Sequence, residues 1–305
     1  MYSICKKELN QFFSSLTGYV AIILFLLING IFLFVLKDSS LFESGYASLD
    51  KFFELAPWVL LFLVPAISMR SLSEEYRAGT FEILQTRPLG PWQIVAGKYL
   101  SILLIILIVL LPTLIYVLTI QQLSATGNID TGGISGSYIG LFMLGSVFAA
   151  ISLCCSGFTQ NAVVAFLVSG FSCLILYFGF SALSRLEVFR GKADYYIEML
   201  GIDFHYHSIS RGVLDSRDIV YFLSVILFFL FLTVKNLEKI NGLYQNTDPR
   251  PVVDPADHGR GQLGRGYLAC QDRPDQREEI HAQQRYQKTA PRFGTAGTGG
   301  CIPDR

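Results

Sequence analysis

The most chemically informative residues of this chain lie in one charged segment, Ser68 to Tyr99, between two long apolar runs. Its charged residues follow a helical spacing at Arg70, Glu74, Glu75 and Arg77. Gly79 then breaks the pattern. Adjacent residues of a helix face different directions, so Glu74 and Glu75 indicate surface contacts rather than a catalytic acid pair. The chemistry that we predict here is ionic and apolar docking of another protein.

The second half of this segment predicts a short helix held between two turns. Thr80 is suited to cap a helix from Phe81 to Thr86, and Glu82 lies in its first turn, where the helix dipole favours an anion. Arg-Pro-Leu-Gly at 87–90 is typical of a turn, and Pro91 suits the first position of the next helix. We interpret the short helix as a surface on which a partner can push.

Motifs for nucleotide, acyl-transfer or metalloprotease chemistry are absent from the sequence. There is no G-x-x-x-x-G-K-[ST] phosphate loop, no G-x-S-x-G and no H-E-x-x-H. His205 and His207 suggest a metal site, but no Cys or third His is near them, and packing in an aromatic interfacial segment is favoured. The six cysteines show no disulfide or zinc pattern. We therefore expect no catalytic residue, cofactor or metal.

The composition indicates a membrane protein. Of 305 residues, 51% are hydrophobic and only 16% are charged, and the net charge of +0 gives no indication of nucleic-acid binding. Six uncharged or nearly uncharged runs approach the ~20 residues that a helix needs to cross ~30 Å of hydrocarbon. They are Tyr19–Leu36, Leu55–Met69, Tyr99–Ile120, Tyr138–Phe158, Ala162–Leu183 and Ile219–Val234. The sequence predicts an all-α integral membrane protein with about six transmembrane helices.

The segments between these runs predict the orientation. Residues 1–17 form an amphipathic lead, which we interpret as an interfacial helix with one apolar face: Ile4, Leu9, Phe12, Phe13 and Leu16. Lys6 and Lys7 favour a cytoplasmic N-terminus, which also places the C-terminus inside. The charge bias supports this orientation except in the last outer loop, 184–218. Within that loop, 194–215 is too polar to span and predicts an interfacial or re-entrant helix.

The predicted spans contain almost no ionisable residue. Ion-coupled carriers usually place such groups at mid-membrane, so an energy source outside the spans is expected. The lack of buried polar pairs also argues against an intramembrane enzyme. Small residues in the fourth run would let helices approach closely: Gly140, Gly145, Ala149, Ala150, Ser152 and Ser156.

The run Glu74 to Lys98, EEYRAGTFEILQTRPLGPWQIVAGK, resembles the loop of ABC-2 type transporter permeases. The resemblance covers Met1 to about Ile240. It implies a coupling helix that docks in a groove of a separate ABC ATPase subunit, with this contact set: Glu74, Glu75, Arg77, Gly79, Thr80, Phe81, Glu82, Leu84 and Thr86. By position, Gly79 would supply the break, while Phe81 and Leu84 would be apolar knobs. A second permease chain, identical or related, and a bacterial inner membrane are also implied.

Two further segments, KKELNQFFSSLTGY and GIDFHYHSISRGVLDSRDIVYF, are similar to the gliding-motility permeases of Bacteroidota (GldF type). After Asn241 the composition changes to Gly, Arg, Gln, Pro and Asp, which is typical of a disordered tail. Alternatively, shifting the frame of 263–305 by one base permits a segment similar to a companion gliding subunit (GldG type). We therefore expect a permease domain at 1–240 and a disordered tail at 241–305. We interpret the tail as the product of translation that continues, out of frame, into a downstream gene.

Two functions remain open from the sequence. The first is a permease subunit of an ATP-driven exporter that belongs to the gliding-motility machinery. The second is a non-transporting inner-membrane scaffold that anchors a motility or secretion apparatus and uses the ATPase only for assembly. Stimulation of ATPase activity by the reconstituted permease separates the two.

Overall fold

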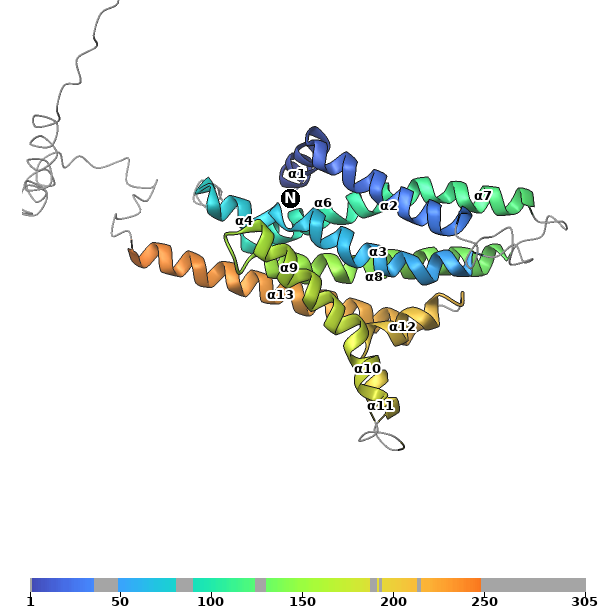
Figure 1. The fold of residues 1–305 in the computed structure, drawn as a ribbon. Helices are drawn as coiled ribbons and strands as arrows, with labels where there is room; N and C mark the ends of the chain where they lie inside the picture. Colours follow the sequence, from blue (N-terminus) through green and yellow to red (C-terminus); the bar gives the residue numbers. More distant parts are fainter. Residues whose placement is uncertain are drawn as a thin grey trace, which may run out of the picture. The chain divides into compact units, whose positions relative to one another are not determined.

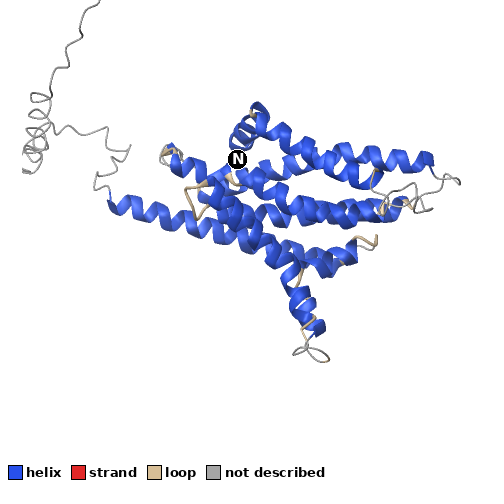
Figure 2. Ribbon diagram, viewed as in Figure 1, coloured by secondary structure: helices blue, strands red, loops and turns tan. Residues whose placement is uncertain are grey.

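The computed structural model describes residues 2–35, 49–80, 90–123, 130–186, 191, 194–212 and 215–247. These residues belong to one compact unit, Met1–Asp248. Within the described ranges the chain is helical and has no strand (Figure 2), which confirms the predicted fold class. The last helix continues to Thr247, past the boundary predicted at 240, and the rest of the predicted tail lies outside the described residues.

Long helices lie along one another in a bundle, and the short helices α10 and α11 project from its side (Figure 1). Their bounds are α1 Tyr2–Ser14, α2 Leu16–Phe34, α3 Asp50–Ser68, α4 Arg70–Arg77, α6 Pro91–Leu110, α7 Leu114–Leu123, α8 Thr131–Ser156, α9 Ala162–Leu174, α10 Phe180–Ser184, α11 Asp194–Glu198, α12 Ile202–Ile209 and α13 Ser216–Thr247. A 3₁₀ turn, Leu111–Thr113, joins α6 to α7, and a π-helix, Ile175–Gly179, joins α9 to α10.

Five stretches of the described chain are long and apolar enough to cross a membrane. They are Asp50–Arg77, Pro91–Gln122, Thr131–Ser156, Ala162–Ser184 and Ser216–Lys239. A sixth arises if α1 and α2, which meet at a bend of 72°, are counted as one broken span. The six predicted runs agree with these stretches, because α2 covers the first run.

Helix α8 lies at the centre of the bundle. Almost all of its second half is buried, and it packs against α3, α6, α9, α12 and α13. A Cβ added at Gly140 would lie 2.7 Å from Cγ2 of Ile209 on α12, so the close approach of these helices requires a glycine there. The close packing predicted from the small residues of this run is confirmed.

The second span and the start of the charged segment form one helical stretch. Helix α3 contains Pro57 and Pro65, and it passes through Met69 into α4 without a loop. The Ser68 hydroxyl donates to the carbonyl oxygen of Val64 at 3.0 Å, which satisfies one backbone group inside the bundle. The segment predicted to leave the bundle at Ser68 therefore stays helical as far as Arg77.

The outer segment differs from the single helix that was predicted for it. It contains two short helices, α11 and α12, and α12 is largely buried against the bundle. Tyr206 is 1% exposed, and its hydroxyl donates to the carbonyl oxygen of Phe53 at 2.7 Å. Helix α12 is thus part of the protein core, whereas α11 has no buried residue.

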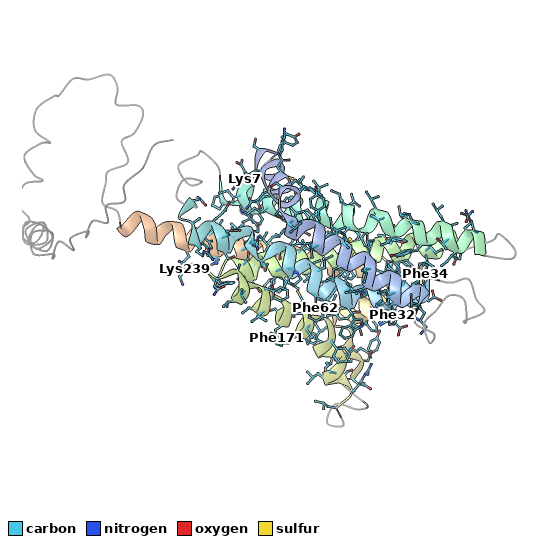
Figure 3. The ribbon with its side chains drawn as sticks, turned by 45° about the horizontal axis from the view of Figure 1, so that its top comes forward. Lys7, Phe32, Phe34, Phe62, Phe171 and Lys239 are labelled. Carbon is cyan, nitrogen blue, oxygen red and sulfur yellow. The ribbon has the colours of Figure 1, made fainter. Side chains whose placement is uncertain are left out.

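The two ends of the bundle differ in character (Figure 3). Lys7 on α1 and Lys239 near the end of α13 lie at one end, whereas Phe32 and Phe34 of α2 lie toward the other. Helix α2 also exposes a row of apolar side chains: Tyr19, Val20, Ile23, Leu24, Leu27 and Ile31. A face of this kind suits hydrocarbon rather than water.

Candidate functional site

Helix α4 carries the first residues of the predicted contact set. Glu74 and Arg77 are exposed, as expected of a docking surface. Gly79 has φ +66°, the left-handed region that favours glycine, so the predicted break in the helix is present. Thr80 already has a helical backbone, and its hydroxyl donates to the Glu75 carbonyl oxygen at 3.5 Å. The amide groups that Thr80 would cap lie outside the described residues, so its cap role stays a prediction.

The remaining members of the set lie outside the described residues. These are Phe81, Glu82, Leu84 and Thr86. The chain is described again from Gly90, and α6 begins at Pro91 with Gly90 as its N-cap, as the sequence predicted. The segment predicted to dock a partner is thus bounded by α4 on one side and by α6 on the other.

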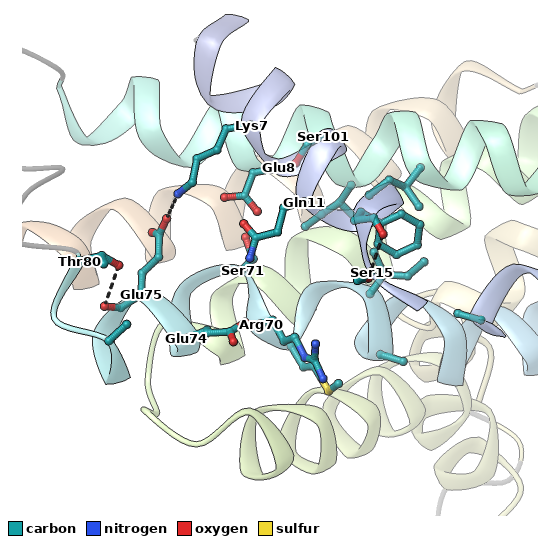
Figure 4. A pocket seen from close by; sticks show the side chains of 18 residues that line it. Lys7, Glu8, Gln11, Ser15, Arg70, Ser71, Glu74, Glu75, Thr80 and Ser101 are labelled. Carbon is teal, nitrogen blue, oxygen red and sulfur yellow. Dashed lines mark hydrogen bonds and ion pairs between the residues drawn. The ribbon is translucent and has the colours of Figure 1, made fainter. Parts of the chain in front are cut away.

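Glu75 departs from the sequence prediction, because it is not a surface acid. Its side chain is 11% exposed, and one carboxylate oxygen lies 2.9 Å from Nζ of Lys7 on α1 (Figure 4). Its other oxygen lies 2.9 Å from Nζ of Lys98 on α6. Glu75 therefore joins α4 to the helices on either side of it and faces inward.

Lys98 is the centre of this ion cluster. Its side chain is fully buried, and Nζ lies 2.9 Å from Glu8 of α1 and donates to the Ser71 carbonyl oxygen. A buried ammonium is costly unless it is paired and hydrogen-bonded. Here Nζ donates to Glu8 and to the Ser71 carbonyl oxygen, and it forms a further ion pair with Glu75. We name Lys7, Glu8, Glu75 and Lys98 the junction cluster.

The junction cluster corrects two sequence expectations. Lys98 had been placed in the polar segment, and the spans were expected to lack buried polar pairs. The apolar face of α1 is also partly used inside the protein, since Ile4 is buried and Phe12 packs against the core. An ionic junction therefore fixes α1, α4 and α6 to one another at this end of the bundle.

A second buried pair lies in the outer segment. His205 Nδ1 is 2.7 Å from Oδ1 of Asp218, and Nε2 is 2.9 Å from the carbonyl oxygen of Met199. The carbonyl can only accept, so Nε2 carries the proton, and the imidazole stacks on Tyr221 at 3.9 Å between ring centroids. Both ring nitrogens are occupied, so this histidine is a structural link between α11, α12 and α13.

His207 has a different partner. Its Nε2 lies 3.3 Å from Oδ1 of Asp203, whose other oxygen accepts from Ser181 at 3.1 Å. The hydrogen bond to Asp203 raises the pKa of His207 despite partial burial. Burial would raise the pKa of Asp203, but the hydrogen bond and charge of His207 outweigh it and hold that pKa below its usual range. The two histidines therefore serve separate pairs, and within the described ranges no group of three metal ligands forms.

Comparison with known proteins places the chain. A family model described as ABC-2 family transporter protein matches residues 2–188, which is more than half of the sequence. No curated protein matches the chain. The matched region includes α1, the junction cluster and the segment that joins α4 to α6. Together with the membrane-length helices, this match shows that the chain belongs to the ABC-2 transporter family and is a multi-pass membrane permease subunit of an ABC transporter.

Proposed function

We propose that this permease couples ATP hydrolysis on a separate ATPase chain to export of a substrate. The ATPase docks on the segment that follows α3, and the contact set is Glu74, Arg77, Gly79, Thr80, Phe81, Glu82, Leu84 and Thr86. Glu75, also part of the predicted set, does not contact the ATPase directly but holds α4 against α1 and α6. Movement of the docked ATPase then displaces α4, and the spans rearrange.

The observation that carries this proposal is the continuity of α3 and α4. The proposed contact residues follow directly on a helical stretch, Asp50–Arg77, that reaches the interior of the bundle. Its α3 part packs against α8, the central helix, and also against α2 and α9. Because close-packed helices transmit strain rather than absorb it, a push on α4 would reach the core.

The proposed assembly contains two permease chains, identical or related, and their ATPases in a bacterial inner membrane. Both termini of the permease lie on the cytoplasmic side. The presence of Lys7 and Lys239 at the same end of the bundle as α4 supports this orientation, because cytoplasmic segments are enriched in Lys and Arg (Figure 3). The junction cluster would then face the ATPase side.

The experiment compares two glycines that flank the docking segment. A Cβ at Gly79 or at Gly90 meets nothing within 4 Å, but only Gly79 has a positive φ. Gly79→Ala therefore changes the backbone preference without a clash, and Gly90→Ala is its matched control. Tagged variants are purified from native membranes and assayed for bound ATPase, alongside Phe81→Asp.

We expect wild type and Gly90→Ala to retain an ATPase and to stimulate its activity after reconstitution. Gly79→Ala should reduce stimulation several-fold, since a strained residue costs ~1 kcal/mol or more, and Phe81→Asp should release the ATPase. Recovery of the ATPase without stimulation by wild type would favour the scaffold function. Absence of any ATPase from the wild-type sample would contradict the proposal.

We further propose that the permease serves a gliding-motility apparatus together with a GldG-type companion. The support is the similarity of its N-terminal and outer segments to GldF-type permeases. Deletion of the gene should abolish colony spreading, and wild type should restore it while Phe81→Asp should not. Normal spreading of the deletion strain would assign the transporter to another process.

A further inference from the structure

A pocket of about 510 Å³ opens where α1, α3, α4 and α6 meet (Figure 4). This volume is within the ~300–1,000 Å³ typical of small-molecule sites. One part of its wall is polar and contains Arg70, Glu74 and members of the junction cluster. The other part is apolar: Phe12, Ala21, Ile67, Ile102 and Ile105. A wall of this kind suits an amphiphile, with a charged head at one end and hydrocarbon at the other.

The charges of the wall separate into two groups. Lys7, Glu8 and Glu75 line the pocket and are already paired within the junction cluster. This leaves one cation and one anion, Arg70 and Glu74, which are exposed and take part in no ion pair among the described residues. Residues four apart on a helix are neighbours and commonly pair when their charges are opposite. Here they remain separate, so both are available to one ligand that carries both signs.

A third group in the wall has no partner. The Ser71 hydroxyl is buried, with the residue 8% exposed, and no described atom is hydrogen-bonded to it. Buried polar groups without a partner are rare in native proteins and call for an explanation such as a missing ligand. Ser71 lies next to Arg70 and lines the same pocket. The polar end thus offers a guanidinium, a hydroxyl and a carboxylate.

The apolar end is continuous with the part of the protein that meets hydrocarbon. Ala21 of α2 lines the pocket, and α2 exposes a row of apolar residues that begins with Tyr19 and Val20. Tyr19 and Val20 directly precede Ala21, so the apolar part of the wall and the exposed row lie on the same turn of α2. The row would accommodate an acyl chain outside the pocket.

We propose that this pocket binds the head group of an amine-bearing zwitterionic phospholipid, of the phosphatidylethanolamine type. The guanidinium of Arg70 holds the phosphate, which it matches in geometry as well as charge. Glu74 accepts from the ammonium, and Ser71 donates to a phosphate oxygen. This lipid ties α1 to α4 at the base of the docking segment, and its binding requires no ATPase.

The test is native mass spectrometry of the purified chain in detergent with added phosphatidylethanolamine. Arg70→Gln and Glu74→Gln should each lower retention of the lipid about tenfold, the effect of losing one charge-assisted hydrogen bond. Arg77→Gln is the matched control, because Arg77 is exposed on the same helix but does not line the pocket. Equal losses in Arg70→Gln and Arg77→Gln would overturn the site.

A further variant separates binding from folding. Ser71→Ala removes an unpartnered buried hydroxyl, so it should keep or raise the unfolding temperature while lipid retention falls. A fall in both the unfolding temperature and lipid retention would mean that Ser71 stabilises the fold. That result would contradict its role in binding the lipid.

Three competing ligands define the head group. Phosphatidylcholine, whose nitrogen has no proton to donate, and anionic phosphatidylglycerol should both be retained more weakly than phosphatidylethanolamine. Equal retention of phosphatidylglycerol would show a simple anion site and contradict the proposal. Equal retention of water-soluble glycerophosphoethanolamine would show that hydrocarbon is not recognised and would contradict it as well.

Discussion

The ammonium group of Lys98 lies 2.9 Å from a carboxylate oxygen of Glu75, and this contact joins α4, which precedes the proposed docking segment, to α6, which follows it. Both side chains are largely removed from solvent, with exposed fractions of 0% and 11%. Glu8 brings α1 to the same ammonium group. One buried cation therefore contacts all three helices, and Lys7 adds a second link between α1 and α4.

Replacement of that cation should be strongly destabilising. Lys98→Met leaves the carboxylates of Glu8 and Glu75 without their shared partner, and breaking a buried pair typically costs ~3–5 kcal/mol. Thermal unfolding in detergent, followed by tryptophan fluorescence, measures the loss. Lys51→Met is the control, since its pair with Glu54 is exposed and should contribute less than ~1 kcal/mol.

The three more buried charges of the cluster can be removed together, leaving the half-exposed Lys7 in place. The triple variant Glu8→Gln, Glu75→Gln, Lys98→Met retains the approximate volume of the cluster but buries no charge, so most of the lost stability should return. A triple variant as unstable as Lys98→Met would show that the cation stabilises through packing instead. The measurement is again the unfolding midpoint, compared across the three proteins.

The contact of Gly140 with Ile209 predicts an asymmetric response to alanine. Gly140→Ala places a methyl group 2.7 Å from Cγ2 of Ile209, and overpacking of this kind costs ~1–3 kcal/mol. Gly170→Ala on α9 meets nothing within 4 Å and should raise stability by up to ~1 kcal/mol, from helix propensity alone. Similar midpoints for the two variants would mean that α12 is free to move away from α8.

The buried pair of the outer segment predicts a non-additive cycle. His205→Ala leaves Asp218 without its ring partner, and Asp218→Asn weakens the same contact, so each should destabilise the protein by several kcal/mol. The double variant should be more stable than the sum of the two losses, because one interaction is removed twice. Additive losses would show that His205 stabilises mainly through Tyr221 and Met199.

The membrane spans, the all-α fold class and the close packing of α8 could be predicted from the sequence. Each of them depends on a pattern within one continuous run of residues, either apolar or small side chains. The junction cluster was missed because Lys98 was counted with the polar segment. Its position was visible in the spacing, since Ile94, Lys98 and Ile102 are four residues apart and share the buried face of α6. A buried lysine on an apolar face of a helix requires an acidic partner, because an unpaired buried ammonium is costly. The spacing of residues does not identify that partner as Glu75 of α4.

Other differences have a similar cause. Between Ser68 and Gly79 the sequence contains no helix breaker, so α3 could continue into α4 although the polarity of the side chains changes there. A change of polarity predicts where a span leaves the membrane, whereas backbone propensity decides where the helix ends. The pair His205–Asp218 joins residues on two helices across a turn, and neither residue predicts the other.

The contact between His207 and Asp203 predicts a limited dependence of stability on pH. The raised pKa of His207 adds stability below its ordinary value of 6.5, and this is lost as the pH rises through the raised value. The lowered pKa of Asp203 adds stability above its ordinary value of 3.8, and this is lost as the pH falls through the lowered value. Between pH 3.8 and pH 6.5, the ordinary pKa values of the two groups, both His207 and Asp203 contribute their full stabilisation.

Wild type should therefore exceed His207→Gln in unfolding midpoint most clearly within that interval, and the difference should shrink at alkaline pH. The side chain of His207 is 56% exposed, so solvent screening keeps the effect below ~1 kcal/mol. Arg211 opposes the protonation of His207 and Glu54 favours it, so Arg211→Gln should raise the folded pKa of His207 further and extend the loss of stability to higher pH. A difference between wild type and His207→Gln that does not change with pH would mean that the imidazole is held by packing rather than by the charge of Asp203.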